Sequence, residues 1–225
     1  MPADQPAGKV EVPLSRLDLL VELLHSQGEA AIATQAAALP GYPLATAVAF
    51  ATDEHHRPVM LISKLAEHTR NLAADPRCSF LIARVGAGGE IARVSLVGDV
   101  QAIAADDALT ERYLRYHPEA ERFLQLGDFG FHRLEPKRAL VVGGFGKAAW
   151  IEGERLVDAP SLPPDAEARL VAAMAGRVAA GTRLLGVDPY GADLSVGGSR
   201  RRIRFSVGPV VADALPATLE RELAP

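Results

Sequence analysis

The stretch LISKLAEHTRNLAADPR, residues 61–77, changes character in its middle. Its first residues form an apolar, strand-like run that ends at Ser63, and the residues that follow have the spacing of a short helix. This order predicts that His68, Thr69 and Arg70 lie just beyond the end of a buried strand. Imidazole, hydroxyl and guanidinium groups in that position suit a phosphate or another anionic ligand, although a short solvated helix would carry the same residues.

Short apolar runs surround this stretch on both sides. The runs EAAIATQAA, LATAVAFAT and PVMLIS lead up to the helix, and CSFLIARV and ARVSLVGDVQAIA follow it. Turn signals such as LPGYP, DEHHR and GAGGE separate the runs. Apolar runs of this length, joined mostly by short turns, predict an antiparallel meander or barrel with one helical interruption.

Helical patterns flank the predicted strands. In LSRLDLLVELLHSQG the residues Leu17, Leu20, Val21 and Leu24 share one face, and Ser15 is placed to cap the helix. The segment DDALTERYLRYHPEAERFLQL predicts a second helix, broken by its proline. FGFHRLEPKRALVVGGFGKAAWI then predicts one or two further strands that end in a glycine-rich turn.

A proline-rich segment, DAPSLPPDA at residues 158–166, predicts a domain boundary. Beyond it the pattern is helix, three strands and a terminal helix. We therefore expect an α+β protein with two domains, residues 1–157 and residues 158–225.

Composition excludes several classes of protein. The chain of 225 residues is 48% hydrophobic and 23% charged with a formal net charge of −4, which favours a soluble globular protein and not a ligand of nucleic acid or of an anionic membrane. The single cysteine, Cys78, cannot form an internal disulfide, and clustered zinc ligands are absent from the sequence, so we expect no metal site. The N-terminal residues lack a signal-peptide pattern, and we expect a cytoplasmic protein.

The ordered motifs GYPLATAVAFA, ISKLAEHTRNL and GGFGKAAWI, with the small C-terminal module, resemble the flavin-binding split-barrel family related to pyridoxamine phosphate oxidase. The closest resemblance within it is to the HugZ-type haem-utilisation branch. The resemblance implies an antiparallel split β-barrel (FMN-binding split barrel) with flanking helices, plus a small C-terminal α-β-β-β-α domain. It also implies a homodimer that binds its ligand at the subunit interface.

The same resemblance implies a set of FMN-binding residues. Ile62 and Ser63 match a tyrosine–threonine pair of the flavin site, and His68, Thr69 and Arg70 occupy the segment that binds the phosphate. Because the oxidase's C-terminal substrate signature is missing, a true pyridoxamine phosphate oxidase is not expected.

Other positions depart from the flavin-binding pattern. Arg93 stands where the family has a flavin-contacting glutamine, and Ala47 and Thr52 stand where it has an arginine and a lysine. Two positive charges are therefore absent from the expected phosphate site, which leaves FMN and haem as alternative cofactors.

Haem binding requires an axial ligand, typically a neutral histidine, and a cation for the propionates. The C-terminal module, where the haem-utilisation branch places a ligating histidine, contains none. The expected ligands are therefore His132 or His68. The adjacent His55 and His56 are predicted to lie in a solvated turn, and His117 at the end of a helix.

The leading hypothesis is flavin- or haem-linked redox chemistry, with no catalytic residue assigned and enzymatic activity left open. The rival is a non-enzymatic regulator that binds another protein, for example an enzyme of tetrapyrrole synthesis. The contact surface would then be the face formed by Arg200, Arg202 and Arg204 in SRRRIRF, which alternation predicts to lie on an exposed edge strand.

Overall fold

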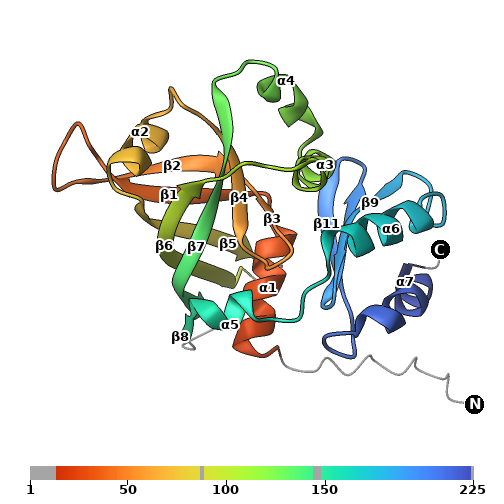
Figure 1. Cartoon of the computed structure of the whole chain (residues 1–225). Coiled ribbons are helices and arrows are strands. Elements are labelled where there is room, and N and C mark those ends of the chain that lie inside the picture. The colour runs from red at the N-terminus through yellow and green to blue at the C-terminus, as the bar shows by residue number, and fades with distance from the viewer. Residues whose placement is uncertain (1–13, 87–88, 144–147, 224–225) are drawn as a thin grey trace, which may run out of the picture.

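The computed structural model describes residues 14–86, 89–143 and 148–223. Its main feature is a curled antiparallel sheet in the order β2-β1-β5-β6-β7-β4-β3, with β8 paired to β7 (Figure 1). The edge strand β2 returns to contact β4, so the sheet closes into a split barrel. The predicted fold class is confirmed. The strands are β1 Glu29–Gln35, β2 Pro43–Ala49, β3 Ala51–Thr52, β4 Pro58–Ser63, β5 Arg77–Val85, β6 Ile91–Ala102, β7 Phe129–Val142 and β8 Ala148–Glu152.

The helix α1, Arg16–Ser26, begins as predicted at Ser15. The Ser15 hydroxyl accepts a hydrogen bond from the Asp18 amide at 3.1 Å, and the Asp18 carboxylate accepts one from the Ser15 amide at 3.1 Å, which completes a capping box. The apolar face of α1 packs into the barrel core, and the helix stands between the barrel and the C-terminal module (Figure 1).

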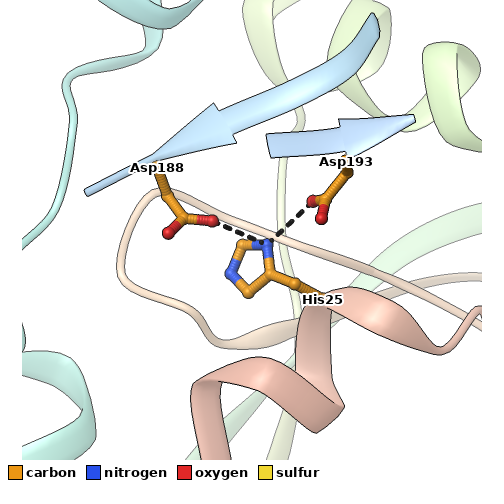
Figure 2. A group of neighbouring side chains, drawn as sticks. All are labelled: His25, Asp188 and Asp193. Atoms are coloured by element: carbon orange, nitrogen blue, oxygen red, sulfur yellow. Dashed lines mark hydrogen bonds and ion pairs between the residues drawn. The ribbon is translucent and has the colours of Figure 1, made fainter. Parts of the chain in front are cut away.

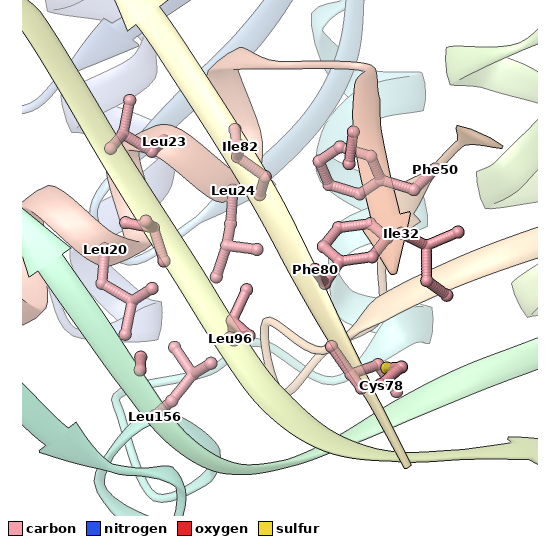
Figure 3. Close-up of a cluster of buried hydrophobic side chains, with 14 of the residues drawn as sticks. Leu20, Leu23, Leu24, Ile32, Phe50, Cys78, Phe80, Ile82, Leu96 and Leu156 are labelled. Atoms are coloured by element: carbon pink, nitrogen blue, oxygen red, sulfur yellow. The ribbon is translucent and has the colours of Figure 1, made fainter. Parts of the chain in front are cut away.

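The barrel core is built from leucines of α1 and from aliphatic and aromatic residues of the strands and their connections (Figure 3). Leu20, Phe50 and Phe80 are fully buried, and the two phenylalanine rings meet edge to face with centroids 5.2 Å apart. Cys78 belongs to the same core, and burial raises the pKa of its thiol to about 12, so this thiol stays protonated and inert.

Helices fill the connections between the barrel strands. The helix α2, Glu67–Ala74, lies between β4 and β5 and contacts β1. The predicted helix after β6 breaks at its proline into α3, Asp107–Tyr116, the 3₁₀ turn η1, Pro118–Ala120, and α4, Glu121–Leu124. The predicted glycine-rich turn falls largely on residues 144–147, outside the described residues, and α5, Gly153–Val157, follows β8.

The C-terminal module has its own core and the predicted order of elements. It contains a three-stranded sheet in the order β11-β10-β9. The module packs on α1 through β11 and on α3 through β9 and α6. The division into domains at residues 157 and 158 stays a prediction. The elements are α6 Pro164–Met174, β9 Thr182–Asp188, β10 Gly191–Val196, β11 Ser199–Arg204, η2 Ala212–Ala214 and α7 Leu215–Leu223. No helix among the described residues is long and apolar enough to span a membrane.

Candidate functional site

The segment that leads into α2 is fixed by hydrogen bonds at the end of β4. The Ser63 hydroxyl donates to the Asp128 carboxylate at 2.6 Å and accepts from the Leu65 amide at 3.0 Å. Ile62 is only 4% exposed and belongs to the barrel core. Ile62 and Ser63 therefore hold the end of β4 in place, and these contacts leave neither side chain free to bind a ligand.

Two polar atoms on α2 are buried without a partner. His68 Nδ1 lies 3.0 Å from the Thr46 hydroxyl on β2, while His68 Nε2 has no hydrogen-bond partner. The Thr69 hydroxyl is likewise buried and unpaired. An unpaired buried polar atom costs about 1–3 kcal/mol, so two of them on one helical turn indicate a place where a ligand or water completes the structure.

The surroundings of His68 keep its ring neutral. Burial lowers the pKa of His68, and the positive charge of a protonated His132 lowers it further. When the Nδ1 proton is donated to Thr46, the lone pair of Nε2 is free. A neutral imidazole with one nitrogen anchored and the other free is the form in which histidine binds metal ions.

His132 is supplied by a different element from His68. It lies on β7, where it pairs with Met60 of β4 and faces the same side of the sheet as that buried residue. Its Nδ1 contacts the Gly130 carbonyl at 3.1 Å and donates a proton to it. Because His132 affects the pKa of His68, the two rings lie within electrostatic range. The two histidines proposed from the sequence are therefore near enough for the charge of His132 to act on His68.

The two arginines of the predicted site lie elsewhere. Arg70 is exposed, and its guanidinium donates to Glu67 at 2.5 Å. Arg93 is exposed on β6 and pairs with Ala83 of β5. Ala83 lies six residues beyond Arg77, where β5 begins, so Arg93 is about 20 Å from the end of α2. The structure therefore does not bring Arg93 to His68 within one chain.

Exposed apolar side chains occupy the loops around α2. Leu39 and Tyr42 lie in the β1–β2 loop, which is tied to α2 by a hydrogen bond from the Ala37 amide to Asn71 at 2.9 Å. Leu65 and Leu126 lie in the segments joined by the Ser63–Asp128 hydrogen bond; all four side chains are more than half exposed. This apolar rim would favour a flat, largely apolar ligand.

A second cluster, which the sequence did not predict, lies where α1 meets the C-terminal sheet. His25 Nδ1 points between Asp188 and Asp193, at 3.2 and 3.1 Å from their carboxylates (Figure 2). The Arg202 guanidinium donates to both carboxylates at 2.7–2.9 Å, and the Tyr116 hydroxyl donates to Asp193 at 2.6 Å. Every oxygen of the two carboxylates thus has a hydrogen-bond partner within the protein.

The prediction of a solvated His55–His56 turn is wrong for His56. This residue is 1% exposed, has a φ of 61°, accepts a hydrogen bond from His25 Nε2 at 2.9 Å and donates from Nε2 to the Pro160 carbonyl at 3.0 Å. Burial lowers the pKa of His56 to about 4, and the charge of His25 adds to this effect. Both nitrogens of His25 have hydrogen-bond partners, Asp193 at Nδ1 and His56 at Nε2.

The expectation of an exposed arginine face on β11 is also wrong. Alternation places Arg200, Arg202 and Arg204 together as predicted, but this face turns toward α1, and the Arg202 side chain is 1% exposed. Arg200 is half-buried against Tyr116. One signal in the sequence was available: His25 follows Val21 by four residues and so lies on the apolar face of α1, where it needs buried partners.

With this geometry established, comparison with known proteins identifies the family. The chain matches the family CREG, beta-barrel, over residues 21–158, and it belongs to this family of split-barrel proteins. The resemblance to the haem-utilisation branch of the split barrels is confirmed by relatives that carry haem-related names.

Three such relatives are informative. The non-canonical heme oxygenase HOZ, chloroplastic, of Arabidopsis thaliana is 40% identical over 116 residues, which cover 51% of this chain and 36% of that protein. The heme oxygenase HutZ of Vibrio cholerae is 32% identical over 108 residues, 44% of this chain and 61% of that protein. A solved heme binding protein from Mycobacterium smegmatis is 28% identical, with a TM-score of 0.61, over 93% of this chain and 96% of that one. The chain thus spans less than two thirds of the length of either curated relative.

Proposed function

We propose that this protein binds haem at the cluster of Thr46, His68, Thr69 and His132, with His68 Nε2 as the axial ligand of the iron. One observation carries the proposal: Nε2 is buried without a partner while Nδ1 is anchored on Thr46. The lowered pKa of His68 favours the neutral ring that a metal ion requires.

The rest of the cluster suits the same ligand. The unpaired Thr69 hydroxyl offers a hydrogen bond on the turn that carries His68, and His132 adds a second polar group at the barrel mouth. The apolar rim of Leu39, Tyr42, Leu65 and Leu126 matches the apolar surface of a porphyrin.

We propose further that the site is completed in a homodimer. Leu81, Val85, Ile91 and Trp150 are exposed on the outer face of β5, β6 and β8, and Arg93 lies on the same face. An exposed apolar face with a central arginine resembles a protein interface more than a solvated surface. A second copy placed there would supply cations for the haem propionates.

A haem bound in this way would supply iron for electron transfer and oxygen chemistry, while the chain holds and orients it. Oxidative degradation of haem is the activity that the names of the two curated relatives suggest for this chain. FMN stays a predicted alternative. Its support is weaker, because Arg70 is engaged by Glu67 at the surface.

The test is a titration of the protein with haem, followed by the Soret band. His68→Ala should weaken haem binding and shift the band, and Thr46→Val should weaken it about tenfold, because it removes the anchor of the ligand. His55→Ala is the matched control, since His55 is partly exposed and contacts Val157, far from α2 in the fold. A Soret band unchanged in His68→Ala but lost in His132→Ala would move the ligand to His132.

A parallel titration with FMN separates the two cofactors. Flavin binding that is lost in Arg70→Ala, together with no response to haem, would contradict the proposal and restore the phosphate-binding interpretation of α2.

A further inference from the structure

A small pocket of about 190 Å³ opens between α3 and the C-terminal sheet. Three elements each contribute an arginine to its wall: Arg115 from α3, Arg183 from β9 and Arg200 from β11. Tyr116 and Leu185 add apolar surface. None of these residues belongs to the His68 cluster.

The Arg200 side chain is held firmly in place. One Nη donates to the Gln27 carbonyl at 2.5 Å, and the guanidinium lies over the Tyr116 ring, 4.8 Å from its centroid. On the other side it passes Gly28 so closely that a side chain there would meet it at 3.0 Å. Its position is therefore set by the protein before any ligand arrives.

Arg200 has no carboxylate in direct contact with its guanidinium in the described part of the chain. Among the described residues, no Asp or Glu lies within ion-pair distance of it. Its other Nη is 3.3 Å from His117 Nε2, but that nitrogen lies 2.7 Å from the Phe50 carbonyl and donates its proton there, so it cannot accept from Arg200. Burial lowers the pKa of both Arg200 and His117, although the charges of Asp193 and Glu119 act on Arg200 in the opposite direction.

The neighbouring arginines add to this excess of positive charge. Arg115 shares its carboxylate partner, Glu167, with the buried Arg112. Arg183 is exposed and forms no ion pair within the part of the chain that the structure describes. Glu119, the one carboxylate in the pocket wall, is more than half exposed and contacts His117 at 3.4 Å. The pocket wall therefore carries three arginines and one carboxylate.

We infer that this pocket binds a phosphate group. Guanidinium groups approaching from three elements present more donors than a carboxylate can accept, and they match the several oxygens and double charge of a phosphate. The Ser195 hydroxyl in the wall adds a further donor. The small volume suits one phosphate group, either free or as the exposed end of a phosphate monoester. This inference does not rest on haem binding.

The experiment is calorimetric titration of the full chain, without haem, with inorganic phosphate, glycerol phosphate and acetate at constant ionic strength. Arg183→Met should weaken phosphate binding at least about tenfold, because it removes a charged donor. Glu119→Gln should tighten binding, because it removes the opposing charge. Arg201→Met is the matched control, since Arg201 is the exposed neighbour of Arg200 and is not part of the pocket wall.

Each outcome decides the inference. Binding of phosphate, of the monoester or of both, with the expected responses of the two variants, supports it, and the tighter ligand identifies the source of the phosphate group. Absence of binding, equal binding of acetate, or equal affinity in wild type and Arg183→Met overturns it. The variants leave Thr46, His68 and His132 intact, so failure here is distinct from failure of haem binding.

Discussion

Arg202 and His68 show how a single side chain acquires its role from its neighbours. Arg202 lies against two buried carboxylates, and its guanidinium donates hydrogen bonds to both of them where water does not reach. His68 Nδ1 is anchored on Thr46, whereas Nε2 has no hydrogen-bond partner and is available to bind a ligand. The arrangement around Arg202 stabilises the fold, and the arrangement around His68 leaves a nitrogen free for a ligand.

The Arg202 arrangement predicts a large loss of stability in Arg202→Met. Asp188 and Asp193 would keep their charges in a buried site without their main partner, which costs about 3–5 kcal/mol. Arg201→Met is the control: its side chain is exposed on the next position of β11, and its effect should stay within about 0.5 kcal/mol. Urea denaturation of both variants measures the difference. Equal, small effects would show that Arg202 faces solvent.

The limits of sequence-based prediction are visible at these residues. The position of His68 and Thr69 just beyond the end of a buried strand could be predicted, because the change of hydrophobic period marks where β4 gives way to α2. The burial of His56 could not be predicted, because the partners that remove it from water, His25 and Pro160, are distant in sequence. For β11 the alternation was predicted correctly and the direction of the face was not, because periodicity does not say which side of a strand is covered.

Strands and helices depend on a few positions where two backbones come close. The pairing of β6 with β7 shifts register between Val97 and Gly98. A side chain on Gly98 would clash with the carbonyl oxygen of Glu135, and this backbone atom cannot move aside as a flexible side chain could. The sequence shows short apolar runs and turn residues, so it predicts that these strands exist. It does not show this bulge, which follows from the curvature of the closed sheet.

Gly98→Ala should therefore destabilise the protein by about 1–3 kcal/mol through overpacking at the bulge. Gly130→Ala is the control on β7, where the nearest atom to an added side chain is 3.9 Å away, and it should leave stability unchanged or slightly raised. Thermal and urea unfolding followed by circular dichroism compare the two. If Gly98→Ala left the stability of the protein unchanged, β6 and β7 would have to be further apart than they are in this structure.

The barrel and the C-terminal module are joined by buried polar groups as well as by apolar packing. His25, His56 and Arg202 form a continuous network across the contact, so the charge state of this network is linked to the stability of the whole chain. Family membership and element order could be read from local motifs, but this contact could not, because it joins α1 to a sheet more than 160 residues later.

The network predicts that stability falls as the solution is acidified from pH 7.5 to 4.5. The folded protein holds the pKa of His56 at about 4, while the unfolded chain binds a proton near pH 6.5, so acid favours the unfolded state in this window. The free energy of unfolding of the wild type should fall about 2–3 kcal/mol more than that of His56→Asn. Asparagine also tolerates the positive φ at this position.

His55→Asn serves as the control for the pH experiment, and its pH dependence should match the wild type. The opposite contribution of Asp53, whose pKa is raised by burial, is common to all three proteins and cancels in the comparison. Fluorescence of Trp150, the single tryptophan, and circular dichroism should give coincident transitions. Parallel pH curves for wild type and His56→Asn would contradict the assignment of this network.

The central claim is that His68 Nε2 binds the iron of haem. Resonance Raman spectroscopy of the ferrous haem complex tests this claim most directly. The account predicts an iron–histidine stretching band in the wild type that is absent in His68→Ala and returns, shifted, when free imidazole is added to that variant. An unchanged band in His68→Ala would show that another residue binds the iron and would contradict the account.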